Sequence, residues 1–256
     1  MEQLLIQAEI IWPAFIAGLL ILATHIPLGR EVLQRGIIFL DLAIAQIAAL
    51  GVIVANTIFL HGSGENTPQT LIAIIAAILG SLGLYSLHRL ETKVQEAIIG
   101  IAFILAATGS VLLLAADPHG GERLKEILVG QILWFQAADL LPLTLAYAGI
   151  LATWFLLKEK LGNWLFYPLF AVSITLSTQV VGVYLVFASL IIPSLATLKE
   201  QNPLIKSYVI GAIAYASGLI ISAFLDLPAG ATIVWCLAIV GLAYFLILGN
   251  KKHQQD

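Results

Sequence analysis

Long apolar runs, separated by short polar breaks, are the feature that most constrains the fold of this chain. Of its 256 residues, 60% are hydrophobic and only 11% are charged, whereas a soluble domain carries about 25% charged residues. A soluble domain of this length cannot hide that much apolar surface from water, but a bilayer can. No polar or Gly/Ser/Pro-rich linker divides the chain, so we predict a single transmembrane domain over residues 1–256.

The runs have the length that membrane-spanning helices need, which is roughly 20 residues each. Helices are required because lipid offers no partner to backbone N–H and C=O groups. We therefore predict an all-α integral membrane protein, a bundle of about eight to nine transmembrane helices. The spans are expected near 10–28, 36–60, 70–88, 97–115, 138–157, 164–178, 180–195, 207–225 and 230–249.

The stretch 164–195 is too long for one ordinary span and short for two. Ser177, Thr178 and Gln179 lie at its middle and Gly182 follows, which predicts a turn or a broken helix that lines a cavity.

If that stretch is a hairpin and the N-terminus lies outside, ten of the twelve Lys and Arg residues are cytoplasmic, as the positive-inside rule requires. This predicts nine crossings, or eight with a re-entrant element, and a cytoplasmic C-terminus. The cytoplasmic set is Arg30, Arg35, Arg89, Lys93, Lys158, Lys160, Lys199, Lys206, Lys251 and Lys252, and the external pair is Arg123 and Lys125.

Several classes of function are excluded by what the sequence lacks. The net charge of −3 and the absence of a basic stripe argue against a nucleic-acid partner. Cys236 is the only cysteine, so neither an intrachain disulfide nor a Cys-x-x-Cys metal site exists. No glycine-rich phosphate loop and no nucleophile beside a histidine are visible, so we expect no enzymatic activity.

Asp41 is the one acid that lies clearly inside a predicted span, where a charge is costly and usually functional. The alternatives are an acid paired with a neighbouring helix, with Arg35 as a possible partner, or one hydrated near the inner surface. Gln46 is the nearest polar neighbour, about 140° round the helix, so on a regular helix the two side chains cannot hold one ion. Either a local bulge aligns the two side chains, or other helices supply ligands, or the cargo is not the usual metal.

Two further groups of polar residues are candidates for a cation path. Ser177, Thr178 and Gln179 are expected to face the path at mid-chain. Asp117, His119 and Glu122 lie close together in a predicted external loop, where they form either a weak entry site or simply a polar loop ahead of an interfacial helix.

The segment 185–203 leaves an apolar run, meets Pro193 and turns polar through Lys199 and Glu200 before Pro203. It reads either as a short amphipathic helix on the cytoplasmic surface or as a loop helix with a proline kink.

Residues 180–198 (VVGVYLVFASLIIPSLATL) resemble the stretch through the coupling helix of the metal-type permeases of ABC importers, which carry zinc, manganese or iron(II). Further resemblances follow in the family's order, and together they cover about residues 12–249. They are Arg35–Gly51 (RGIIFLDLAIAQIAALG), Glu122–Trp134 (ERLKEILVGQILW) and Asp226–Val234 (DLPAGATIV).

The resemblance implies a homodimer, a separate ATP-binding subunit, an external solute-binding protein and a divalent cation as cargo, with no cofactor held by this chain. It assigns docking of the ATP-binding subunit to a short cytoplasmic coupling helix that includes Ser189, Pro193, Ser194, Leu198, Lys199 and Glu200.

The chain departs from the family pattern at one position. The family has Asp and His four residues apart on the helix of Asp41, and here the fourth residue is Ala45, which weakens any inference about the metal. The alternative functions are an ion-coupled secondary transporter and a membrane enzyme or assembly factor.

Overall fold

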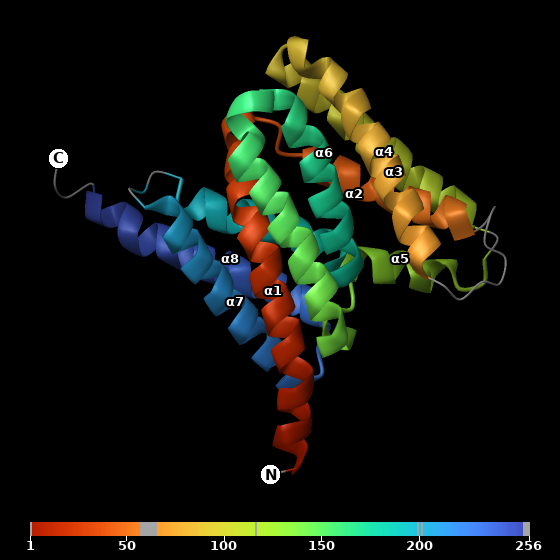
Figure 1. Ribbon diagram of the computed structural model, residues 1–256. Coiled ribbons are helices and arrows are strands. Elements are labelled where there is room, and N and C mark those ends of the chain that lie inside the picture. The colour runs from red at the N-terminus through yellow and green to blue at the C-terminus, as the bar shows by residue number, and fades with distance from the viewer. Residues whose placement is uncertain (1, 57–65, 116, 199, 201, 253–256) are drawn as a thin grey trace. The chain divides into compact units, whose positions relative to one another are not determined.

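The computed structural model describes residues 2–56, 66–115, 117–198, 200 and 202–252, and every regular element in these residues is a helix (Figure 1). The α-helices are α1 (Glu2–Arg35), α2 (Leu40–Val54), α3 (Asn66–Tyr85), α4 (Thr92–Leu114), α5 (Gly120–Val129), α6 (Leu140–Ala196), α7 (Pro203–Leu225) and α8 (Ala229–Lys252). Short 3₁₀ turns are η2 (Ser86–Arg89), η3 (Ile132–Trp134) and η4 (Ala137–Asp139).

The prediction of an all-α membrane protein is confirmed. In the described part of the chain, seven helical segments are long and apolar enough to cross a bilayer. They are Glu9–Arg35, Thr70–Arg89, Thr92–Leu114, Ala137–Leu157, Trp164–Ala196, Pro203–Leu225 and Ala229–Ile247. The predicted span 36–60 corresponds to α2, which is apolar but only 15 residues long. The last residues of the predicted span, 57–60, lie outside the described part of the chain.

Helix α6 bends back on itself between its first two predicted spans, as Figure 1 shows. The rings of Trp154 and Phe166 lie 5.8 Å apart between centroids. Twelve residues of straight α-helix would cover about 18 Å, so the helix axis must reverse between these two side chains. The helical run therefore supplies two membrane segments, Ala137–Leu157 and Trp164–Ala196.

The second segment stays helical at Ser177, Thr178 and Gln179, so the predicted turn or break is not formed at these polar residues. The hydroxyls of Ser177 and Thr178 donate to the carbonyls of Ser173 and Ile174, each over 2.7 Å. Such bonds to the carbonyl four residues back let a hydroxyl lie within a helix without interrupting it. The local irregularity falls instead at Gly182, whose φ is +78°.

Gly182 and Gly130 support each other's unusual backbone. Both have positive φ, at +78° and +72°, and their main chains are in direct contact. A methyl group added to Gly182 would lie 2.3 Å from the nitrogen of Gly130, and one added to Gly130 would lie 2.1 Å from the carbonyl carbon of Val181. The end of α5 is thus packed backbone to backbone against the irregular point in α6.

The chain forms two compact units that alternate along the sequence. The first unit comprises Met1–Gln34, Gln131–Gly149 and Tyr184–Asp256, and the second unit comprises Arg35–Gly130 and Ile150–Val183. In the first unit α7 packs on α8, and the ring of Tyr215 lies against Gly18 of α1. In the second unit α2 packs between α3 and α4, with Gly51 against Ala76.

The positive-inside count assumed a hairpin between residues 164 and 195. However, α6 is helical throughout that stretch, so the structure does not contain the hairpin on which the count depends. The cytoplasmic location of the C-terminus therefore stays a prediction.

We predict that Gly182→Ala destabilises the protein by at least about 2 kcal/mol, because a side chain at positive φ is strained and would strike the backbone of Gly130. The apparent melting temperature of the detergent-solubilised protein measures this. Gly100→Ala is the control, since its methyl group would meet no atom within 4 Å and alanine favours a helix. Equal melting temperatures for the two variants would contradict the predicted backbone packing.

Candidate cation path and docking segment

Asp41 lies in the first turn of α2 and is almost fully buried, with 1% of its surface exposed. Its Oδ1 accepts the N–H of Leu42 over 2.8 Å. Its Oδ2 is buried and meets no hydrogen-bond donor among the residues that the structure describes. Burying a polar atom without a partner is costly, so this oxygen is the strongest candidate in the second unit for contact with a passing cation.

A second carboxyl group lies at the same end of α2. Glu96 of α4 accepts the N–H of Phe39, the residue before the helix, over 3.2 Å through Oε1. Its Oε2 is also buried without a partner in the described part of the chain. A helix N-terminus carries partial positive charge and stabilises anions, which explains why two acids are tolerated here.

The sequence interpretation missed Glu96 because it placed the start of the span at residue 97. Helix α4 begins five residues earlier, at Thr92, and so includes Glu96. An extended helical pattern before residue 97 was the signal that would have identified it.

Gln46 is buried, but it lies on a different face of α2 from Asp41. Helix α2 is continuous from Leu40 to Val54, so the bulge that would have aligned the two side chains is not formed. Two of the alternatives raised by the sequence therefore stand: ligands from other helices, with Glu96 as a carboxyl group near the same helix end, or a cargo other than the usual metal.

The mid-chain candidates have separate roles in the structure. The hydroxyls of Ser177 and Thr178 are buried and bond within α6, whereas Gln179 is exposed and its Oε1 accepts the hydroxyl of Thr70 on α3 over 3.0 Å. Ser173, one turn before Ser177, is fully buried, and its Oγ has no partner among the described residues. It is a further oxygen that the sequence interpretation did not select.

The predicted entry loop is largely occupied by its own contacts. Asp117 pairs with Arg123 over 3.2 Å and accepts the N–H of His119 over 2.9 Å. His119 and Glu122 approach within 3.4 Å, and both side chains are mostly exposed. The structure therefore brings His119 and Glu122 together, while Asp117 serves the start of α5.

The docking residues named from the sequence divide into two sets. Ser189, Pro193 and Ser194 are buried in the first unit, where Ser189 bonds the hydroxyl of Tyr215 over 2.8 Å. Leu198 is 43% exposed. Leu195, which the sequence interpretation did not select, is exposed beside it. Lys199 lies outside the described residues.

The coupling helix expected from the resemblance differs in form. Residues 189–196 are the last turns of α6, and the described residues between Ala196 and Pro203 form a turn without a helix of their own. The candidate docking surface is therefore a helix end followed by a turn.

Comparison with known proteins identifies the family. The model of the ABC 3 transport family matches residues 7–168 and 157–248, which is nearly the whole chain. The chain belongs to this family. As an ABC 3 transport protein it is a multi-pass membrane permease, and ATP hydrolysis resides in a separate subunit of such systems. The family expected from the sequence is thereby confirmed.

The chain is also similar to individual proteins. The chain is 26% identical over 259 residues to the high-affinity zinc uptake system membrane protein ZnuB of Haemophilus influenzae, covering 90% of this chain and 94% of that protein. It is 25% identical to an uncharacterized membrane protein of Cyanophora paradoxa, covering 98% and 89%. The solved structure of PsaBC from Streptococcus pneumoniae in complex with Fab has the same fold, with a TM-score of 0.66, 23% identity and coverage of 93% and 90%.

We predict that Ser194→Asp lowers the melting temperature and that Leu198→Asp does not. Ser194 is fully buried, and its Oγ lies 3.4 Å from the carbonyl oxygen of Ile26, so a charge there is desolvated without a partner. Leu198 already faces outward. A lower melting temperature for Leu198→Asp than for Ser194→Asp would show that Leu198, and not Ser194, is the buried residue of this segment.

Proposed function

We propose that this permease imports a divalent metal cation, using ATP hydrolysed by a separate subunit. Two copies of the chain would form the transport unit, an external solute-binding protein would deliver the cargo, and the C-terminus would lie in the cytoplasm. The zinc uptake role stated for ZnuB supports the class of cargo. The partners are those implied by membership in an ABC transport family.

The observation that carries the proposal is the buried Oδ2 of Asp41, which has no hydrogen-bond partner in the described part of the chain. A carboxylate inside a membrane protein marks an ion path more often than a structural contact. The candidate ligands near it are oxygen atoms, because residue 45 is alanine and the second acid at this helix end is Glu96. Oxygen ligands suit harder cations such as Mn²⁺ better than imidazole-preferring ones, so manganese is tested beside zinc.

The ATP-binding subunit would dock on the end of α6 and on the turn that follows it. Leu195 and Leu198 are exposed there, whereas Ser189 and Ser194 of the same helix end are buried. Small exposed apolar groups beside a polar turn are suited to a protein partner. Movement of the ATP-binding subunit during ATP hydrolysis would then shift the ends of α6 and α7. This shift would open the path alternately to the outside and to the inside.

We predict that Asp41→Asn reduces ATP-driven cation uptake at least about tenfold, since one lost charge contact of about 1.4 kcal/mol has that effect. Uptake of radioactive zinc and manganese is measured in proteoliposomes that contain the permease purified with its ATP-binding subunit. Asp226→Asn is the matched control, because that carboxyl group is exposed in the turn after α7 and asparagine tolerates its positive φ.

Unchanged uptake by Asp41→Asn would remove Asp41 from the path. Proton-driven uptake without any ATP-binding subunit, abolished by the same substitution, would favour the secondary transporter instead.

We predict that Leu198→Asp weakens binding of the ATP-binding subunit, because the exposed leucine would be replaced by a charge within an apolar contact. Affinity purification of the tagged permease followed by mass spectrometry measures how much subunit is retained. Leu227→Asp, at a similarly exposed leucine in the turn between α7 and α8, tests whether any new charge has this effect. Equal retention by wild type and Leu198→Asp would place the docking surface elsewhere.

A further inference from the structure

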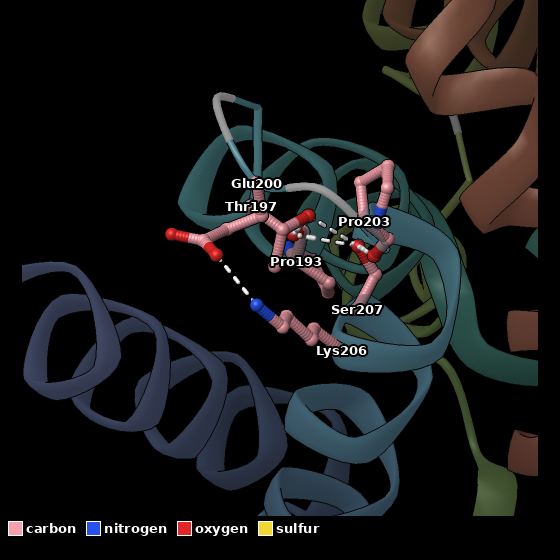
Figure 2. A network of polar contacts seen from close by, with 6 residues as sticks. All are labelled: Pro193, Thr197, Glu200, Pro203, Lys206 and Ser207. Carbon is pink, nitrogen blue, oxygen red and sulfur yellow. Dashed lines mark hydrogen bonds and ion pairs between the residues drawn. The ribbon is translucent and has the colours of Figure 1, made fainter. Parts of the chain in front are cut away.

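A buried pair of hydroxyl groups closes the turn between α6 and α7. Thr197 follows the last residue of α6, and Ser207 lies in the first turns of α7. Both residues are fully buried, and their hydroxyl oxygens lie 2.6 Å apart (Figure 2). We call these two residues the clasp.

The clasp also satisfies backbone groups that the end of α6 leaves open. The last four carbonyls of a helix have no N–H partner within it, and Pro193 is the first of these four in α6. Its carbonyl oxygen lies 3.0 Å from the hydroxyl of Thr197 and 3.0 Å from that of Ser207. The hydroxyl of Ser207 also lies 2.8 Å from the carbonyl oxygen of Pro203. The two hydroxyl hydrogens are therefore shared among each other's oxygens and the carbonyl oxygens of Pro193 and Pro203.

An ion pair spans the same turn outside the clasp. Nζ of Lys206 lies 2.5 Å from Oε2 of Glu200, as Figure 2 shows, and the N–H of Glu200 donates to the carbonyl of Thr197 over 3.1 Å. The turn is therefore held to α7 at its buried base by the clasp and at its outer side by Lys206.

Position gives this arrangement a consequence for transport. Leu198, the exposed residue of the docking segment, directly follows Thr197. A force applied at Leu198 reaches α7 through the clasp, because Thr197 and Ser207 join the end of one helix to the beginning of the next. Without that bond, the ion pair of Lys206 with Glu200 would be the remaining side-chain tie described between the turn and α7, and it lies at the outer side of the turn.

We propose that Thr197 and Ser207 are positioning residues that make the ends of α6 and α7 move as one body when the ATP-binding subunit moves. The inference rests on the proposed function, because it needs a partner that pushes on the turn. Neither residue is assigned a contact with the cargo. Their role is to keep ATP hydrolysis coupled to cation movement.

The test is the number of cations imported for each ATP hydrolysed. Thr197→Val and Ser207→Ala are combined, and the variant is purified with its ATP-binding subunit and placed in proteoliposomes with zinc or manganese. We expect hydrolysis to continue while uptake per ATP falls about tenfold, since a lost buried hydrogen bond costs close to the free energy of a tenfold change.

The matched control combines Thr175→Val and Ser110→Ala. These hydroxyls are also buried, and they bond carbonyls of their own helices, those of Ala171 and Ala106. The control variant should keep the wild-type ratio, although its melting temperature falls by a similar amount. Thr197→Ser, which retains the hydroxyl, should also keep the ratio.

A covalent replacement of the clasp provides rescue. Thr197→Cys with Ser207→Cys, in a Cys236→Ala background, places two sulfurs where hydroxyls lie 2.6 Å apart, within reach of a disulfide. We expect the oxidised variant to regain the ratio of uptake to hydrolysis and the reduced variant to lose it.

The outcomes are distinguishable. If wild type shows no ATP-driven uptake, the proposed function fails and this inference fails with it. If wild type imports the cation and the clasp variant has the same ratio, or loses hydrolysis and uptake in equal proportion, the clasp is only structural and the inference alone is overturned.

Discussion

The requirement that every backbone polar group find a partner inside the protein governs this structure. Within the helices the i−4 bonds meet it, and each irregular point has its own solution. At the end of α6 the carbonyl of Pro193 accepts side-chain hydroxyls. At Gly182 the main chain leaves helical geometry only where the main chain of Gly130 lies against it. Buried side-chain atoms carry a similar cost when they lack a partner, and Oδ2 of Asp41, which has none among the described residues, is therefore where we expect function.

Serine and threonine show how far sequence interpretation reaches in such a protein. Polarity at Ser177 and Thr178 suggested a break, yet their hydroxyls bond the preceding turn and the helix continues. The sequence correctly indicated that the long stretch is irregular. The exact point depends on contact with Gly130, which is distant in sequence, and no local pattern carries that information.

The candidate path was predictable where it depended on a single costly group. Asp41 was identified because an acid within an apolar run needs an explanation. Glu96 was not, because its role depends on where α4 begins and on its bond to Phe39 at the start of another helix. The docking segment stays a prediction, and the sequence could not say which of its residues face outward, since packing decides that Ser194 is buried and Leu198 exposed.

The contact of Gly130 with Gly182 has a consequence for how this gene can change. A side chain at either position meets main-chain atoms of the other, and main-chain atoms cannot be made smaller by a second substitution. No compensating mutation at the partner position is therefore available. The two codons are expected to drift only among synonymous glycine codons for as long as α5 ends against α6 in this way.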